Sequence, residues 1–462
     1  MTSRAPIILP VLLLAAAMSG PETRAATVRY PVAEAIRSWY WAAEVDGGEN
    51  GVGRARTMDS PWNVRARGDH GGEYAFTSFA MDRPVRLTVR PLGATPRQPP
   101  ALDDVRILPS GAPVKIVRKG ADAVELLVER PCKFSVEPAG REHPLLVFAR
   151  GPERNLPAAG DPKVKMIGPG VVAPAGGKLA LNDGETLYLR PGTVLKAGVE
   201  LHRVGNVRVC GRGVIDGSDF PWGRQPTPCV IRMLSCRNVR IEGVTIVGGW
   251  QWNVVPWNSE DVLIEDVAVC GARVWNDDGI NVVNSRRVAI RDCFVRTDDD
   301  CFCMKGCDWR CGPCEKVTVE NCVFWCDRAR VMLLGWVESS APYIRDLVFR
   351  NNDIIHFAGP VFTCVPLGGC TMGGILIEDV RINNERKTIA EPLVRVYPKS
   401  NPKRRNPGFG QLDGVTIRNV VCEGPRMEPV FDLKGSDAAH PPRNVSVSPW
   451  AWRHSHKQGE RK

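Results

Sequence analysis

Two runs of aspartate are the residues of this chain whose type and spacing point most directly to chemistry. The first is Asn276-Asp277-Asp278-Gly279, and the second is Asp298-Asp299-Asp300. Aspartate-rich turns end many strands and can also bind Ca²⁺, so either run alone favours a structural or calcium-binding interpretation. Carboxylates brought close together hinder each other's ionisation, which raises at least one pKa. A carboxyl group raised in this way can act as a general acid near neutral pH.

The elements that must position these aspartates are short strands in a repeated pattern that begins near residue 187. Each copy alternates apolar with polar residues, and Gly, Asn or Asp follows before the next apolar pair. A period of two predicts strands, and a coil of this length buries its inward residues only by stacking on another coil. The pattern therefore predicts an all-β, right-handed parallel β-helix, and it fits neither leucine-rich nor helical repeats. The copies are Leu187–Leu189, Val207–Val209, Val239–Ile241, Val262–Ile264, Val288–Ile290, Val317–Val319, Leu347–Phe349, Ile375–Ile377 and Val415–Ile417.

A further strand in three consecutive coils can be aligned by its apolar residues, over 278–282, 300–304 and 330–334. Equivalent positions of stacked coils lie about 4.8 Å apart, so this alignment places Asp278 over Asp300. Neighbouring residues of a strand point to opposite faces, and Asp299 would therefore need a bend or bulge to join them. The coincidence of both runs on adjacent coils predicts a catalytic group made of Asp278, Asp299 and Asp300.

Four segments are predicted along the chain. Residues 1–26 have a basic start, an apolar run and small residues before a cleavage point, which predicts a signal peptide and a secreted or periplasmic product. Residues 27–160 do not repeat, and their strand-like runs predict a small β-sandwich domain that caps the end of the helix. Residues 161–450 form the predicted β-helix catalytic domain, and 451–462 a polar tail. No later stretch is apolar over the length that spans a bilayer, so no membrane insertion is expected.

Composition limits the partners and the redox chemistry. The net charge of +10 comes from scattered basic residues, which favours a solvated surface over nucleic-acid binding. The 16 cysteines indicate disulfide bonds or buried cysteine stacks. Cys311-Gly312-Pro313-Cys314 suggests zinc, but no second Cys-x-x-Cys pair exists and no histidine lies between His202 and His356. No metal or other cofactor is expected, and the oligomeric state is left open.

The aspartate runs carry a resemblance to a known family. Asn276-Asp277-Asp278-Gly279 resembles the Asn-Thr-Asp-Gly motif of the polygalacturonases, glycoside hydrolase family 28, and Asp299-Asp300-Cys301 with Gly306 resembles that family's Asp-Asp-Cys and following Gly. The resemblance covers roughly residues 160 to 425 and includes the tryptophan segment 252–256. It implies an inverting glycoside hydrolase in which Asp299 is the general acid, while Asp278 and Asp300 activate the attacking water. An inverting enzyme needs such an acid and base on opposite sides of the bond.

The sequence departs from the polygalacturonase pattern in two places. The family's Gly-His-Gly would align with Ala329-Arg330-Val331, where Arg330 replaces histidine. Its Arg-Ile-Lys, which holds the substrate carboxylate, would align with Val361-Phe362-Thr363, which contains no basic residue. The related dextranase and isopullulanase family, family 49, also uses three aspartates on a β-helix, follows a β-sandwich and lacks that histidine, and Leu334-Gly335-Trp336 is similar to it. The resemblance is therefore to the clan of both families, and the expected substrate is a neutral or otherwise non-galacturonate polysaccharide or oligosaccharide.

Residues near the aspartates are predicted to bind the substrate. Tryptophans in the same coils can stack on sugar rings, although tryptophan is often only packed. Lys305 supports a carboxylate or a sugar hydroxyl, or forms a plain salt bridge. Arg330 holds an aspartate ionised or, alternatively, binds a substrate carboxylate. The predicted binding residues are Asn276, Trp275, Trp252, Lys305, Arg330 and Trp336.

Two other functions stay open from the sequence. One is a polysaccharide lyase or epimerase on the same fold, in which the aspartates hold Ca²⁺ and Arg330 is the base. The other is a non-catalytic glycan-binding surface protein. A lyase would form an unsaturated product, and a chelator would stop its formation. A glycan-binding protein would still bind glycan after the three aspartates are removed.

Overall fold

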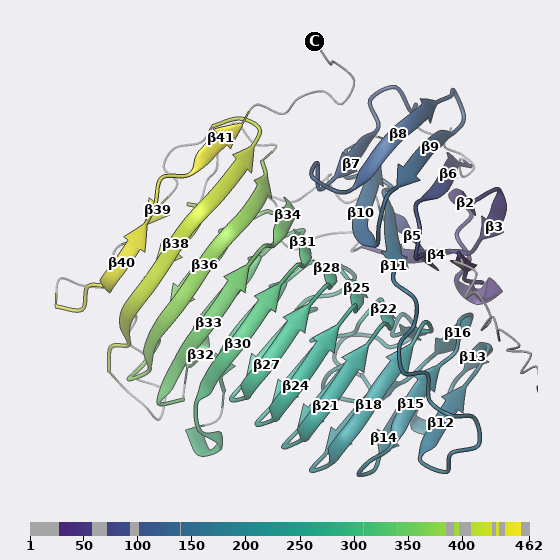
Figure 1. Ribbon diagram of the computed structural model, residues 1–462. Coiled ribbons are helices and arrows are strands. Elements are labelled where there is room, and N and C mark those ends of the chain that lie inside the picture. Colours follow the sequence, from purple (N-terminus) through teal and green to yellow (C-terminus); the bar gives the residue numbers. More distant parts are fainter. Residues whose placement is uncertain are drawn as a thin grey trace, which may run out of the picture.

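The computed structural model describes residues 27–57, 72–92, 101–138, 140–307, 309–339, 341–384, 392–396, 408–426, 431–433 and 439–453. The predicted signal peptide and residues 454–462 of the predicted tail lie outside the described residues. Figure 1 shows a small two-sheet domain, in purple and blue, beside a long stack of parallel strands in teal, green and yellow. Within the described ranges, no helix has the length and apolar character needed to cross a membrane. The predicted fold class, a parallel β-helix preceded by a β-sandwich, is confirmed.

The sandwich consists of two sheets whose strands pair antiparallel, except that β5 and β11 pair in parallel. The first sheet contains β1 (Val28–Arg29), β4 (Val52–Arg56), β5 (Glu73–Ala80), β7 (Arg106–Leu108), β10 (Cys132–Glu137) and β11 (Leu145–Arg150). The second contains β2 (Trp41–Val45), β3 (Gly48–Asn50), β6 (Val85–Pro91), β8 (Val114–Lys119) and β9 (Val124–Val128). A short 3₁₀ helix, η1 (Glu34–Ile36), precedes β2.

The β-helix repeats three strands per coil, and each strand pairs in parallel with its counterpart in the next coil. The first row is β12 (Val164–Ile167), β15 (Thr186–Leu189), β18 (Gly205–Gly211), β21 (Arg237–Glu242), β24 (Glu260–Glu265), β27 (Arg286–Arg291), β30 (Cys314–Glu320), β33 (Tyr343–Arg350) and β40 (Arg443–Val447). The second row is β13 (Gly170–Val172), β16 (Thr193–Leu195), β19 (Val214–Asp216), β22 (Thr245–Val247), β25 (Ala268–Cys270), β28 (Phe294–Thr297), β31 (Val323–Cys326), β34 (Asp353–His356) and β41 (Ala451–Arg453). Two long strands, β36 (Thr371–Asn383) and β38 (Gln411–Glu423), run through both rows.

The third row forms a separate sheet and carries the candidate site. It contains β14 (Lys178–Leu181), β17 (Gly198–His202), β20 (Ile231–Leu234), β23 (Val254–Trp257), β26 (Ile280–Val283), β29 (Phe302–Gly306), β32 (Met332–Ser339), β35 (Phe362–Val365), β37 (Val394–Val396) and β39 (Phe431–Asp432). Two 3₁₀ turns, η3 (Ala175–Gly177) and η4 (Trp309–Cys311), interrupt the connections. In the second row, β41 pairs with β38, so ordered strand continues past residue 450, into the segment predicted as a polar tail.

The corner between the first and second rows explains the Gly, Asn or Asp in every copy of the repeat. The corner residue has a positive φ, a conformation that glycine adopts freely and that Asn and Asp tolerate better than other residues. The corner residues and their φ angles are Gly243 (76°), Asp266 (55°), Asp292 (54°), Asn321 (59°), Asn351 (52°), Asp379 (55°) and Asn419 (55°). The turn residue is therefore needed for the chain to change direction once per coil.

The register of the third row is the one that the apolar pattern predicts. Ile280 pairs with Phe302, which pairs with Met332, and these side chains point into the core of the coil. The backbone just before these strands is also paired, because Gly279 N–H donates to the Asp300 carbonyl at 2.9 Å and Cys301 N–H to the Arg330 carbonyl at 3.0 Å. Asp278 therefore lies over Asp300, and Asp300 over Arg330.

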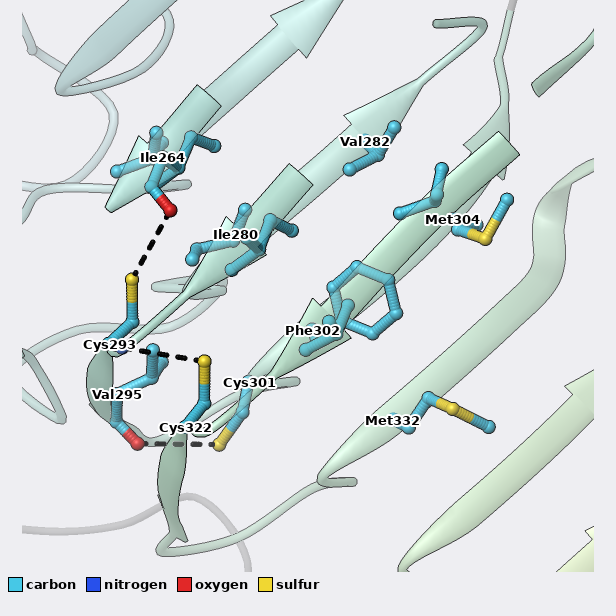
Figure 2. Packing of buried hydrophobic residues seen from close by; sticks show 14 of the residues in the cluster. Ile264, Ile280, Val282, Cys293, Val295, Cys301, Phe302, Met304, Cys322 and Met332 are labelled. Atoms are coloured by element: carbon cyan, nitrogen blue, oxygen red, sulfur yellow. Dashed lines mark hydrogen bonds between the residues drawn. The ribbon is translucent and has the colours of Figure 1, made fainter. Parts of the chain in front are cut away.

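The cysteines form buried stacks instead of disulfide bonds. All 16 lie within the described residues, where no disulfide bond is found, and all except Cys132, Cys307 and Cys311 are buried. Figure 2 shows Cys293 and Cys322 one above the other, where Cys293 N–H donates to the Cys322 sulfur at 3.4 Å. Burial raises the pKa of the Cys322 thiol well above its ordinary value, so these thiols act as small apolar core residues. Of the two sequence interpretations, the structure shows the cysteine stack.

The sandwich packs along the side of the β-helix, so the expectation that it caps the end is wrong. Many outward side chains of the second row are apolar, and they need cover along several coils. Phe148 of β11 lies 5.4 Å from Phe294 of β28 between ring centroids, in one cluster with Trp325 and Ile355. A polar joint lies nearby, where His356 of β34 contacts Glu137 of β10 at 2.8 Å, with both side chains fully buried.

A cluster of ion pairs links the two domains at a corner of the β-helix. Asp266 contacts Lys133 at 2.6 Å and Arg150 at 2.9 Å, both from the sandwich, and Arg212 of the β-helix at 2.7 Å. Burial would raise the pKa of Asp266, but the charges of these three residues outweigh it and hold the pKa below the ordinary value. The carboxylate is therefore stabilised by folding.

We predict that Asp266→Asn lowers the free energy of unfolding by about 3 kcal/mol at pH 7, because three cations lose their shared carboxylate. A folded-state pKa below the unfolded value gives stability that is present above the unfolded pKa and lost as the pH falls. The difference between variant and wild type should therefore narrow below about pH 4, as measured by urea unfolding. The control Asp261→Asn breaks an exposed pair with Arg287 and should change stability by less than about 0.5 kcal/mol. A loss that does not depend on pH would contradict the charge explanation.

Candidate active site

The aspartates lie where the chain passes from the second row to the third. Asp278 ends the loop between β25 and β26, and Asp299 and Asp300 lie in the turn between β28 and β29. Asp278 and Asp300 are only 2% and 3% exposed, and the side chain of Asp299 is 13% exposed. Asp299 lies in a bend of the chain between the two strands, so the bend that strand alternation required for Asp299 to join Asp300 is present. The Thr297 hydroxyl fixes this turn by donating to the Asp299 carbonyl at 2.6 Å.

Asp278 and Asp300 form a close pair whose charges are balanced by cations. One oxygen of each carboxylate and the Cys303 sulfur lie within 4.8 Å of one another. Lys305 Nζ contacts Asp278 Oδ2 at 2.9 Å, and the Asn281 amide donates to the same oxygen at 3.0 Å. Arg330 donates to Asp300 Oδ1 from its backbone N–H at 3.1 Å and from its guanidinium at 3.4 Å.

The pKa of Asp300 is raised, first by burial, while Arg330 opposes the rise and the charge of Asp278 adds to it. Arg330 therefore favours the ionised form of Asp300 that a base needs. The predicted contact between Arg330 and an aspartate is present in the structure. Lys305 forms the predicted salt bridge to a carboxylate.

Asp299 has the environment of a general acid. Its Oδ2 contacts Arg328 Nη2 at 3.2 Å and accepts a bond from the Asn276 amide at 3.4 Å. Burial raises the pKa of Asp299 to about 7, with further contributions from the charges of Asp278 and Asp300 and opposition from Arg328. The group can therefore hold a proton near neutral pH.

The carboxyl group of Asp277 holds the backbone segments that carry the other aspartates. It is fully buried, and its Oδ1 accepts the backbone N–H groups of Asp298 and Asp299 at 2.9 and 3.0 Å. Its Oδ2 accepts the N–H of Ala272. One carboxyl group thus joins the loop that carries Asp278 to the turn that carries Asp299. Gly279 completes this close approach, since a Cβ there would lie 2.4 Å from the Cys301 carbonyl oxygen.

Two tryptophans lie against the cations of the site. Lys305 Nζ is 4.2 Å from the ring centroid of Trp252, and the Arg330 guanidinium is 4.7 Å from that of Trp336. A break in strand register between β29 and β32, where Gly306 pairs with Ser339, forms a bulge after Gly335. Trp336 lies on this bulge with a φ of 72°, a strained conformation for a bulky residue that is typical of functional sites. Trp275 is 41% exposed and directly precedes Asn276, whereas Trp250 and Trp325 are fully buried.

The structure brings eight of the nine predicted site residues into one network of contacts. Direct contacts join the three aspartates, Asn276, Lys305 and Arg330, and the cations join Trp252 and Trp336 to them. Trp275 is placed beside the network by its position in the chain. Sequence reasoning missed Arg328, Asn281, Cys303 and the anchoring role of Asp277. The available signal was the coil spacing, because Asn281 and Cys303 are paired residues of adjacent coils and Arg328 stands one coil after Asp298.

Comparison with known proteins agrees with this geometry. Residues 190–324 match the model for glycosyl hydrolases family 28, and this segment contains all three aspartates. A probable polygalacturonase of Vitis vinifera is 24% identical over 243 residues, which cover 49% of this chain and 40% of that protein. A probable polygalacturonase of Arabidopsis thaliana is 25% identical over 182 residues, covering 33% of this chain and 39% of that protein. The chain therefore spans about two fifths of the length of these relatives.

Two solved structures share the fold. An exopolygalacturonase from Thermotoga maritima superposes with a TM-score of 0.53 at 18% identity, over 63% of this chain and 79% of its own. Dex49A from Penicillium minioluteum superposes with a TM-score of 0.57 at 14% identity, over 91% of this chain and 96% of its own. This share of the chain is large enough to include the sandwich. The resemblance to the polygalacturonase-like clan of glycoside hydrolases is confirmed.

Proposed function

We propose that the protein is an inverting glycoside hydrolase that cleaves a polysaccharide or oligosaccharide with the β-helix as its catalytic domain. The observation that carries the proposal is the contact of Asp299 with Asp300, next to the close pair of Asp278 and Asp300 that Lys305 and Arg330 contact. Burial in this group raises the pKa of Asp299 to about 7. The family match over the same residues supports the reaction class. The segment 1–26 supports export of the protein.

In the proposed reaction, Asp299 gives its proton to the glycosidic oxygen as the bond from that oxygen to the anomeric carbon breaks. Water attacks the anomeric carbon from the opposite face, and Asp300 with Asp278 accepts the proton that the water loses. Each turnover thus consumes one water and yields two free sugar ends. The cycle closes when Asp299 takes up a proton and the Asp300 and Asp278 pair releases the one it accepted, both through solvent.

The cations of the site support a neutral substrate. Lys305, Arg328 and Arg330 each contact an aspartate. The third-row position aligned with the carboxylate-binding motif of polygalacturonases is occupied by Thr363, which is 1% exposed. A uronate carboxylate bound without a dedicated cation would lose several kcal/mol through desolvation. We therefore propose that a neutral or differently substituted glycan is a better substrate than polygalacturonate.

The two alternatives fit these contacts less well. Ca²⁺ prefers a shell of six to eight oxygen ligands, whereas Asp278 and Asp300 share their position with a cysteine sulfur and two protein cations. Arg330 as the base of a lyase would have to lose a proton that the neighbouring Asp300 helps to retain. A glycan-binding protein would have no need for a carboxyl group with a pKa near neutrality.

We predict that Asp299→Asn, Asp278→Asn and Asp300→Asn each lower kcat by at least about 100-fold without loss of the fold. The substrate is found by assaying the wild type on a panel of neutral glycans and polygalacturonate with detection of new reducing ends, and thermal unfolding checks each variant. Asp261→Asn, which changes an exposed side chain on the first-row strand β24, is the matched control and should keep full activity. Near-normal activity of Asp299→Asn would show that the proposed acid is wrong. Polygalacturonate as the best substrate would contradict the proposed substrate class.

The pH profile tests the roles of Asp299 and Arg330. Activity should fall as the pH rises through about 7, because the acid must be protonated. Arg330→Ala removes the charge that opposes the raised pKa of Asp300, so the acid limb should move to higher pH, with a lower kcat and a modest change in KM. Arg330→Lys keeps the charge and should move the limb less. If Arg330 binds a substrate carboxylate instead, its loss would chiefly raise KM for a uronic-acid polymer.

A further inference from the structure

An exposed pair of aromatic rings lies next to the aspartates, and it joins the predicted binding residue Trp275 to a second tryptophan, Trp222, that has no role described so far. Trp222 is 50% exposed and Trp275 is 41% exposed, and their ring centroids are 5.8 Å apart. Among the described residues, two other exposed aromatic side chains have different partners, since Arg54 covers Trp39 and Phe409 stacks on His440. Contiguous exposed apolar surface of this kind marks binding sites.

The two rings are presented by loops that the protein holds in place. Trp222 follows β19, and Trp275 follows β25, two coils further on. Arg273 joins these loops by donating to the carbonyls of Phe220 at 2.8 Å, Gly248 at 3.0 Å and Gly217 at 3.2 Å. Phe220 in turn packs edge-on against the buried ring of Trp250 at 5.0 Å. Binding at the pair would therefore cost little ordering of the chain.

The position and chemistry of the pair indicate what it binds. Trp275 is the residue before Asn276, whose amide contacts the proposed acid Asp299. A tryptophan face offers a large apolar surface to the C–H face of a sugar ring. The nearby guanidinium of Arg273 donates to backbone carbonyls, so these contacts direct its charge to the protein and not to a sugar. The rings meet at 61°, so a pyranose stacked on one is bounded at its edge by the other.

We propose that Trp222 and Trp275 form a sugar-binding subsite that takes an uncharged pyranose ring of the substrate chain beside Asp299, with Arg273 as the residue that positions the Trp222 loop. This inference rests on the proposed function for its substrate, and it adds the place and the chemical class of one bound sugar unit. It also adds Trp222, which lies far from the aspartates in the sequence.

The first experiment measures binding without turnover. Asp299→Asn is the host, and its retardation is measured in native gels that contain dextran, amylopectin, galactan, xylan or polygalacturonate. We expect a neutral polysaccharide to retard the host, and Trp222→Ala in that host to weaken the apparent affinity about 10-fold. Trp39→Ala, an equally exposed tryptophan of the sandwich, should leave it unchanged. Any of three results would overturn the proposal. The Trp222→Ala and Trp39→Ala variants could bind with equal affinity, the host could bind polygalacturonate most strongly, or it could bind no neutral polysaccharide.

The second experiment uses the active enzyme and distinguishes the two proposals. On the polysaccharide that binds the host, Trp222→Ala should raise KM about 10-fold with kcat nearly unchanged, and Trp222→Phe should restore most of the loss. Arg273→Met should give the same KM effect while both tryptophans remain. A fall in kcat with unchanged KM would overturn the subsite. If the wild type releases no product but the Trp222 effect on binding persists, the hydrolase proposal fails and the subsite stands.

Discussion

Crowding of carboxyl groups in two stacked coils is the interaction on which the site depends. Parallel pairing of β26 with β29 forces one aspartate run over the other, and three cations lie among the five acids. The acids are Asp277, Asp278, Asp298, Asp299 and Asp300, and the cations are Lys305, Arg328 and Arg330. Burial raises the pKa of Asp298 to about 6 and that of Asp299 to about 7, and the charges of neighbouring aspartates add to both rises while Arg328 opposes them. The coil geometry thus places a carboxyl group that can hold a proton near neutral pH beside the pair of Asp278 and Asp300, which Lys305 and Arg330 contact.

The arrangement behind the aspartates explains how such crowding is compatible with a stable fold. Asp277 accepts three backbone N–H groups, so its carboxyl group acts as a joint between coils. Its loop is held by the sandwich, because the Tyr74 hydroxyl donates to the Gly271 carbonyl at 2.7 Å. Arg296, in the strand before the catalytic turn, is packed between the rings of Tyr74 and Trp325 and contacts Asp327 at 2.9 Å. The sandwich therefore helps to hold the loops of the site in place, although it contributes none of the proposed catalytic residues.

Local pattern was enough to predict the β-helix, its corner residues and the stacking of Asp278 on Asp300. Each of these follows from a period of two or from the residue types that tolerate a positive φ at a turn. Features that depend on contacts between distant segments were not predictable in this way. The sandwich lies along the second row because outward residues such as Phe294 and Trp325 are apolar, a pattern that looks the same as an inward one in the sequence. Trp222 reaches the site through a loop whose course no periodicity describes, whereas Arg328 stands one coil after Asp298 and the coil spacing could have found it. The cysteines show the limit of composition, since the same spacing suits a disulfide or a stack.

The stereochemistry of the product tests the central claim most directly. Once a cleaved glycan is identified, proton NMR in the first minutes of the reaction shows the anomeric configuration of the new reducing end before mutarotation mixes the two forms. An acid and a water-activating pair on opposite faces of the bond predict a product with inverted configuration. A product with retained configuration would show that one aspartate attacks the sugar directly, and would contradict the assignment of Asp278 and Asp300 as the groups that activate water.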